Sequence, residues 1–222
     1  MAADRGLSGP LPAGGVGGCP GLFVLATYRV SGEFFVTPNL PLERWLLRLD
    51  AAALIDTGLL RAYSSVKAMR STFELLYLLV YAMVPVGAAV LAVGGRADWL
   101  PRYWAVVFAA ELTCYATLPW LQTRPPRTIE AAPATASVDA LRQLNLAVLE
   151  RGSIQVNTLP SAHAAGAIAL ALVMVEALPA IGGVFLAIAI GITVATVLGR
   201  YHYLVDAVLG VAVAAVAWLV VG

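Results

Sequence analysis

Long apolar runs, separated by short polar intervals, make up most of the chain after residue 72. A helix needs about 20 mostly apolar residues to cross the ~30 Å hydrocarbon core of a bilayer, because it rises 1.5 Å per residue. Most of the intervals are short, so neighbouring helices are expected to be antiparallel. We therefore predict an all-α fold, a polytopic membrane helix bundle with five spans at residues 73–93, 103–121, 161–178, 181–198 and 204–221.

The first 70 residues differ from this pattern. Residues 1–20 are rich in Gly, Pro and Ala and lack the features of a cleaved signal peptide, so we interpret them as a disordered tail. Residues 21–38 are apolar apart from Arg29 and Glu33, whose spacing allows pairing on one helical face, and this segment is a candidate sixth span. Residues 39–70 interleave basic and apolar positions, which is typical of an amphipathic helix at the membrane interface.

Composition supports this assignment. Hydrophobic residues make up 60% of the 222 positions and charged residues 12%, and the mean hydropathy of +0.84 is typical of an integral membrane protein. The formal net charge of +1 argues against a nucleic-acid binder. Cys19 and Cys114 each stand alone, so neither a disulfide framework nor a metal-ligand spacing can be recognised.

Three polar motifs are expected at one face of the membrane. They are Thr123-Arg-Pro-Pro-Arg127, Leu159-Pro-Ser-Ala-His163 and Gly199-Arg-Tyr-His-Tyr-Leu-Val-Asp206. The polar interval 122–159, with an expected surface helix at residues 137–150, joins the first motif to the second without a span. The hairpin at residues 176–180 then returns the chain to the third. Counting spans therefore places the three motifs on the same side.

The residue types in these motifs suit a phosphoryl group. His202 and Asp206 are four residues apart, so on a helix they share a face, and the carboxylate can hold the imidazole and favour its charged form. Ser161 and His163 open an apolar segment, where free backbone N–H groups and the positive end of the helix dipole favour an anion. The first motif adds two arginines, whose planar fork binds two oxygens together. Each residue alone is more simply an interface residue, but the combination favours a functional site.

Together these motifs resemble the three signatures of the type 2 phosphatidic acid phosphatase superfamily, over roughly residues 73–222. The matching residues are Arg124-Pro125, Pro160-Ser-Ala-His163 and His202 with Asp206. Because His202-Tyr203 and Asp206 are similar to a His-Tyr-x-x-Asp pattern, the form is closest to the branch of inositol phosphorylceramide synthases and sphingomyelin synthases. The resemblance implies a six-helix core and a membrane catalytic domain at residues 71–222.

The resemblance also implies roles for individual residues. His202 would be the nucleophile that forms a phosphohistidine, Asp206 its orienting carboxylate and His163 the acid for the leaving group. Ser161 and Arg124 would bind phosphate, and no metal or other cofactor would be needed.

Two positions depart from the family. Thr117 stands where its first motif usually has a lysine, and Thr196 where its third usually has an arginine. Arg127 and Arg200 are candidate replacements as phosphate ligands.

Two functions remain open on the sequence. The first is a phosphatase or phospho-headgroup transferase whose substrate is a lipid or polyprenyl phosphate; the second is a non-catalytic membrane or transport protein that keeps the fold. The oligomeric state is left open.

The expected location is the cell membrane, with multiple spans. The family resemblance places the site on the extracytoplasmic face, whereas nine Lys and Arg in residues 39–70 and 122–159 favour the cytoplasm. We expect the extracytoplasmic face, because several of these arginines have a substrate to bind and a sixth span would put the tail inside.

Overall fold

The computed structural model describes residues 19–130 and 139–221, and in these residues every regular element is a helix. The predicted all-α fold is therefore confirmed for the described part of the chain. Apart from the helices, these residues contain one isolated bridge, between Thr123 and Asn157. The elements are α1 (Cys19–Gly32), α2 (Leu40–Asp50), the π-helix η1 (Ala51–Ile55), α3 (Leu59–Ser65), α4 (Lys67–Val93), the 3-10 helix η2 (Ala97–Trp99), α5 (Leu100–Ala116), α6 (Pro126–Ile129), α7 (Ala140–Gly152), α8 (Ala162–Ala177), α9 (Pro179–Leu198) and α10 (Leu204–Val221).

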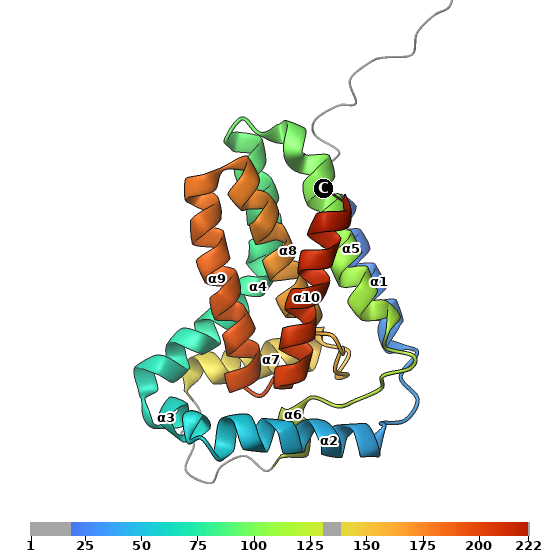
Figure 1. The fold of residues 1–222 in the computed structure, drawn as a ribbon, viewed down its shortest axis with the longest axis vertical. Helices are drawn as coiled ribbons and strands as arrows, with labels where there is room; N and C mark the ends of the chain where they lie inside the picture. Colours follow the sequence, from blue (N-terminus) through green and yellow to red (C-terminus); the bar gives the residue numbers. More distant parts are fainter. Residues whose placement is uncertain (1–18, 131–138, 222) are drawn as a thin grey trace, which may run out of the picture.

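Helix α8 is the centre of a bundle in which α4, α5, α9 and α10 stand around it (Figure 1). Its sequence is rich in Ala and Gly, so neighbouring backbones can approach closely. At Gly210 of α10, for example, a Cβ atom would lie only 2.6 Å from the carbonyl oxygen of Ser161. This close approach packs α10 against the start of α8, where the second motif lies, about one turn after the third motif ends at Asp206.

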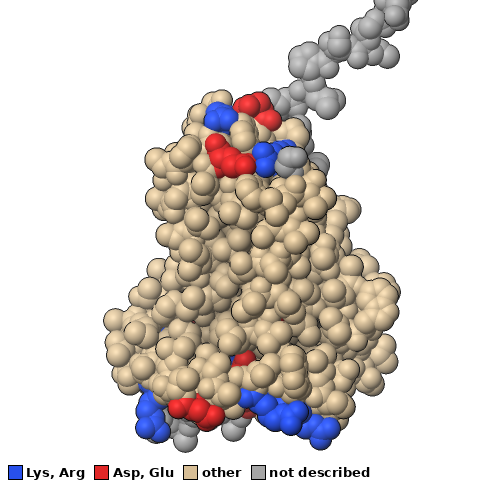
Figure 2. Space-filling view, viewed as in Figure 1, with Lys and Arg blue, Asp and Glu red and all other residues tan. Residues whose placement is uncertain are grey.

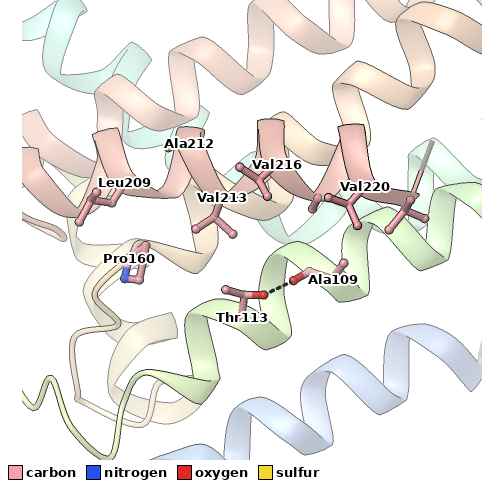
Figure 3. Close-up of a pocket in the computed structure, with 10 residues that line it drawn as sticks. Ala109, Thr113, Pro160, Leu209, Ala212, Val213, Val216 and Val220 are labelled. Atoms are coloured by element: carbon pink, nitrogen blue, oxygen red, sulfur yellow. Dashed lines mark hydrogen bonds between the residues drawn. The ribbon is translucent and has the colours of Figure 1, made fainter.

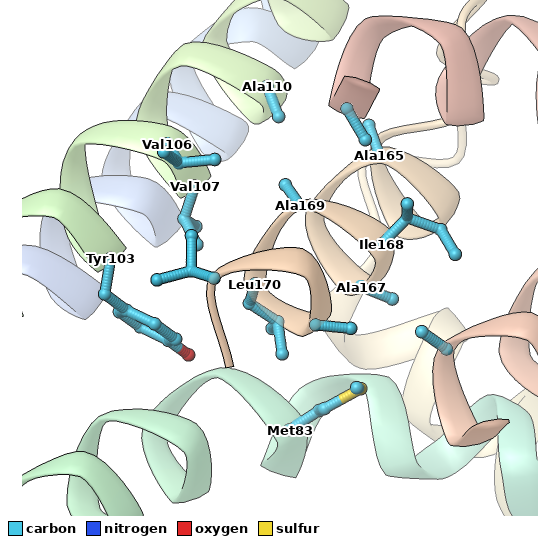
Figure 4. Packing of buried hydrophobic residues seen from close by; sticks show 14 of the residues in the cluster. Met83, Tyr103, Val106, Val107, Ala110, Ala165, Ala167, Ile168, Ala169 and Leu170 are labelled. Carbon is cyan, nitrogen blue, oxygen red and sulfur yellow. The ribbon is translucent and has the colours of Figure 1, made fainter. Parts of the chain in front are cut away.

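The bundle core forms where α8 faces α4 and α5. Val106, Val107 and Leu170 are fully buried and meet between the helices, with Met83 of α4 completing the layer (Figure 4). Tyr103 is also fully buried, and its hydroxyl donates a hydrogen bond of 2.6 Å to the carbonyl oxygen of Val84. Its polar atom is therefore satisfied inside an otherwise apolar interface.

Most charged residues lie at the two ends of the bundle; Glu111 of α5, buried beside Gly166 of α8, is an exception. On the face shown in Figure 2, Lys, Arg, Asp and Glu gather at the two ends, with a broad uncharged belt between them. In the described part of the chain, three helices are long and apolar enough to cross a membrane: α4, α9 and α10. The shorter α8 is also apolar. These features show a membrane protein.

The candidate span at residues 21–38 is helical only over α1, whose 14 residues correspond to about 21 Å. The helix packs beside α5, where the rings of Phe23 and Phe108 meet edge to face at 5.6 Å. After Gly32 the chain turns away from the helical path. The backbone N–H groups of Val36 and Thr37 then donate to the side chain of Gln122. Helix α1 is therefore shorter than the ~30 Å that a full crossing requires.

Residues 39–70 do not form one helix: α2 continues into η1, α3 follows, and α4 begins at Lys67; α2 lies across the end of the bundle (Figure 1). The helical path breaks at Gly58, whose φ of +75° is a left-handed conformation that favours glycine. Helix α2 turns Glu43, Leu46 and Asp50 inward and leaves Trp45 exposed. Two carboxylates thus point from α2 toward the motif end of the bundle.

The expected surface helix at residues 137–150 corresponds to α7, and residues 137–138 lie outside the described residues. This helix packs against the start of α4, where the side-chain amide of Asn145 donates to the carbonyl oxygen of Glu74 at 2.9 Å. Helices α2 and α7 and the short α6 therefore surround the same end of the bundle (Figure 1).

Candidate active site

Backbone hydrogen bonds join the three motifs to one another. The N–H of Arg127 in the first motif donates to the carbonyl oxygen of Arg200 in the third, at 3.0 Å. The N–H of Ser161 in the second motif donates to the carbonyl oxygen of Asp206 in the third, at 2.9 Å. The three motifs therefore lie together at one end of the bundle, as the span count predicts.

The two histidines face each other at this junction. Nε2 of His202 lies 3.4 Å from Nδ1 of His163, and Nδ1 of His202 lies 3.5 Å from a carboxylate oxygen of Asp206. His202 is only 5% exposed. Helix α10 begins at Leu204, so His202 precedes the helix and does not share a helical face with Asp206. The loop, and not an i,i+4 helical pair, brings the imidazole beside the carboxylate.

Asp206 is held in place by two donors. Its Oδ2 accepts a 2.7 Å hydrogen bond from the side chain of Asn157 and a 3.0 Å bond from the N–H of Tyr203. It also lies in the first turn of α10, where the helix dipole favours a carboxylate. Sequence reasoning missed Asn157, although its place three residues before Pro160 is a signal that could have suggested it.

Burial sets the charge of His202. Burial of the ring lowers the pKa of His202 to about 3, and the positive charge of Arg127 adds to this effect. The imidazole is therefore neutral near pH 7, contrary to the expectation that Asp206 favours its charged form. A neutral ring with its proton on Nδ1, toward Asp206, leaves a lone pair on Nε2. That lone pair points at His163.

An aromatic stack positions His163. Tyr77 of α4 lies against its ring with centroids 5.4 Å apart and an angle of 17°, and Tyr81 meets it edge-on at 5.9 Å. On its other side Tyr77 stacks on Tyr201 at 3.8 Å. Tyr77 and Tyr81 of α4, together with Tyr201, thus fix the orientation of the His163 ring.

Ser161 is the N-cap residue of α8. Its hydroxyl oxygen accepts a hydrogen bond of 3.3 Å from the N–H of Ala164, and the residue is fully buried. The hydroxyl proton is still free to be donated, because capping uses only the oxygen. Ser161 therefore organises the helix start, where the N–H of Ala162 is also bound, by the hydroxyl oxygen of Thr158 at 3.2 Å.

Two of the three candidate phosphate-binding arginines are held by carboxylates. Arg124 binds Glu43 of α2 through Nε at 3.1 Å and Nη2 at 2.8 Å. Arg200 binds Asp50 through Nη1 at 2.5 Å and Glu130 through Nε and Nη2 at 2.8 and 2.6 Å. These ion pairs hold α2 and the end of α6 against the motif loops. The structure does not bring the guanidinium groups of Arg124 and Arg200 to the histidines.

Arg127 is the arginine that remains beside the histidines. It is half-buried, its guanidinium carbon lies 5.7 Å from the centre of the Tyr201 ring, and burial lowers its pKa. No carboxylate of the described residues pairs with it. A partly buried cation without a protein partner favours an anionic ligand, because an unpaired charge is costly to bury.

The two threonines at usually basic positions have structural hydrogen bonds. The hydroxyl of Thr117 donates to the carbonyl oxygens of Cys114 and Leu159. The carbonyl oxygen of Thr196 accepts the N–H groups of Tyr201 and His202, both at 2.9 Å. Neither residue supplies charge, so the positive charge of the site comes from other positions.

An apolar groove of about 360 Å³ lies between α5 and α10 (Figure 3). Leu209, Val213 and Val216 line it, and the hydroxyl of Thr113 is bonded back to Ala109. The residues that line this groove include none that is titratable. Among the described residues, no group of three His, Cys, Asp or Glu side chains is placed to hold a metal ion.

The fold and the site together define a class: a membrane helix bundle with two histidines, a carboxylate and arginine at one end. Comparison with protein families agrees with this description. The chain belongs to the PAP2 superfamily, whose model matches residues 44–220, and this confirms the superfamily expected from the motifs. The match includes all the site residues and leaves out α1. Neither the search of curated proteins nor that of solved structures found a match. Membership of this superfamily suggests phosphatase-type activity.

Proposed function

We propose that the protein is an integral membrane phosphatase or phospho-headgroup transferase that acts on a lipid or polyprenyl phosphate through a phosphohistidine at His202. The observation that carries this proposal is the neutral, buried imidazole of His202 between Asp206 and His163. A nucleophile needs an available lone pair, an orienting group on its other nitrogen and an acid for the leaving group. The three side chains supply these parts.

In the first step, Nε2 of His202 attacks phosphorus and the bond from phosphorus to the leaving oxygen breaks. His163 takes up a proton when the anionic phosphate is bound beside it and gives this proton to the leaving oxygen, and Asp206 stabilises the imidazolium formed at His202. In the second step, His163 takes a proton from water or an alcohol, whose oxygen attacks phosphorus and frees His202. A phosphoryl group does not fit between nitrogens 3.4 Å apart, so the substrate must separate the two rings on binding.

The structure supports Arg127 and the start of α8 as the phosphate ligands. Arg127 has no carboxylate partner among the described residues. At the start of α8 the N–H groups of Ala162 and Ala164 already bind Thr158 and Ser161, so the N–H of His163 and the Ser161 hydroxyl are the groups that can donate to phosphate oxygens. For Arg124 or Arg200 to bind phosphate, an ion pair with α2 would have to break. We therefore assign these two arginines to positioning α2 over the site.

A non-catalytic membrane or transport protein is the second candidate. It is favoured by Thr117 and Thr196 at usually basic positions, together with two arginines already neutralised by carboxylates.

The decisive experiment is phosphate release from a panel of lipid phosphates by the detergent-purified protein, compared with His202→Gln, which fills the buried space. We expect release by the parent protein only. Equal release by both would remove His202 as the nucleophile, and no release on any substrate would favour the second candidate.

We further propose five spans, formed by α4, α5, α8, α9 and α10, with α1 as a partial sixth and the site on the extracytoplasmic face. The His202-Tyr203 pair and Asp206 favour the sphingolipid-headgroup transferase branch. The side of the membrane can be tested in cells with Glu150→Cys, an exposed position on α7, in a chain whose own two cysteines are replaced. Labelling by an impermeant reagent in intact cells is expected. Labelling only after permeabilisation would place the site in the cytoplasm.

A further inference from the structure

Arg142 of α7 is a second cation bonded to the third motif, from a part of the chain that no motif includes. Its Nη1 donates to a carboxylate oxygen of Glu74 at 2.9 Å and to the carbonyl oxygen of Gly199 at 2.8 Å. Gly199 is three residues before His202, so Arg142 is bonded to the loop that carries the candidate nucleophile. The arginine is therefore fixed against the end of α9 that leads into this loop.

Glu74 uses only part of the hydrogen-bonding capacity of Arg142. Oε2 of Glu74 already accepts bonds from the hydroxyl of Tyr201 and the side chain of Asn145, both at 2.5 Å. Arg142 has five N–H groups: Nη1 makes the two bonds above, the guanidinium also interacts with the Tyr201 hydroxyl, and no carboxylate of the described residues other than Glu74 pairs with it. The side chain of Glu74 is 4% exposed and that of Arg142 is 26% exposed. The free edge of the guanidinium group can therefore be reached by a ligand.

The two arginines meet at one aromatic ring. The guanidinium carbons of Arg142 and Arg127 lie over Tyr201, at 4.8 and 5.7 Å from its centre. Tyr201 stacks on Tyr77, and Tyr77 stacks on His163. Two like charges on one ring repel each other, and Glu74 is the one carboxylate of the described residues that pairs with either of them. An anion with several oxygens would relieve this repulsion.

We propose that Arg142 binds the phosphate of the substrate together with Arg127 and supplies the charge that Thr117 and Thr196 lack. This inference rests on the phosphoryl-transfer function proposed above. Arg124 and Arg200 are not assigned this role, because carboxylates bind each of their guanidinium groups through two or more nitrogens. The alternative is that Arg142 only balances the buried charge of Glu74.

The test measures the affinity of inorganic phosphate, both as an inhibitor of lipid-phosphate turnover and directly by phosphorus NMR. Arg142→Gln alone leaves Glu74 buried without its cation, so the key variant is the double substitution Glu74→Gln with Arg142→Gln, which removes both charges. Arg70→Gln is the matched control. Arg70 pairs with Asp139, directly before α7, at 3.0 Å, so this change also loosens α7 and removes one positive charge at a different place.

We expect the double variant to bind inorganic phosphate at least tenfold more weakly, while Arg70→Gln stays within twofold of the parent protein. Unchanged phosphate affinity in the double variant would show that Arg142 only balances Glu74 and would overturn the inference. An equal loss in Arg70→Gln would also overturn it, because the effect would then come from the position of α7. If the parent protein neither binds phosphate nor turns over any lipid phosphate, it is the proposed function that fails.

Discussion

Replacing Arg127 by Gln is expected to remove the main charged contact between the protein and the phosphate. The side chain is half-buried beside the two histidines and pairs with no carboxylate of the described residues, so glutamine can occupy its place without exposing a buried negative charge. The change should therefore affect catalysis more than folding.

The expected magnitude follows from the chemistry of the contact. Hydrogen bonds to a charged group contribute about 1.5 to 3 kcal/mol each, and an arginine can make two with one phosphoryl group. A loss of about 2.7 kcal/mol of transition-state stabilisation corresponds to about a 100-fold fall in kcat/KM. We expect at least this fall for Arg127→Gln.

Arg200→Gln should behave in the opposite way. Asp50 is 1% exposed and would lose its cation, and breaking a buried ion pair typically costs about 3 to 5 kcal/mol of stability. Its effect should appear in the unfolding midpoint, with kcat/KM of the folded fraction within about tenfold of the parent. Arg48→Gln, an exposed change on α2, serves as the control for losing one positive charge at the same end of the molecule.

The assay is steady-state turnover of one phosphomonoester and one phosphodiester lipid in detergent micelles, with unfolding followed on the same samples. A phosphodiester carries one negative charge fewer and should lose less when Arg127 is replaced. The reasoning would be refuted if Arg127→Gln kept normal kcat/KM on both substrates, or if Arg200→Gln lost as much activity as Arg127→Gln without loss of stability.

Three further predictions concern the charge states of the site. Asp206→Asn should keep the acceptor for Asn157 and Tyr203 but lose the charge, so kcat should fall by about 10⁴-fold, as for other carboxylates that orient a histidine; a near-normal kcat would mean that Asp206 is only structural. Because the pKa of His202 is lowered on folding, between about pH 3 and 6.5 its ring is neutral in the folded protein and charged in the unfolded chain. The contribution of the neutral ring to stability is therefore fully present above about pH 6.5 and is lost as the pH falls toward about 3. Chemical unfolding in mixed micelles should show this contribution as a slope of about 1.4 kcal/mol per pH unit below pH 6.5, and an unchanged slope in His202→Gln would contradict it. Treatment with a chelator should leave turnover intact, and loss of turnover restored by a divalent ion would indicate a metal-dependent mechanism.

The sequence by itself determined the apolar helices and the grouping of the motifs. Runs of apolar residues predict helix positions because the length of a span is fixed by the bilayer, and the number of spans fixes which loops share a side. This reasoning placed His163, His202 and Asp206 together before any contact was known. It did not identify the end of α1 at Gly32 or the break at Gly58, because a turn inside an otherwise apolar or amphipathic stretch depends on what the chain packs against.

Only the tertiary structure decided which arginine is free to act. Glu43 is 81 residues from Arg124, and Asp50 is 150 residues from Arg200, so no local spacing could show these pairs. The start of α10 after His202 and the burial of that ring also decided that the imidazole is neutral. Periodicity describes neighbours three or four residues apart, whereas charge and burial at a site depend on side chains that the fold brings from distant parts of the chain.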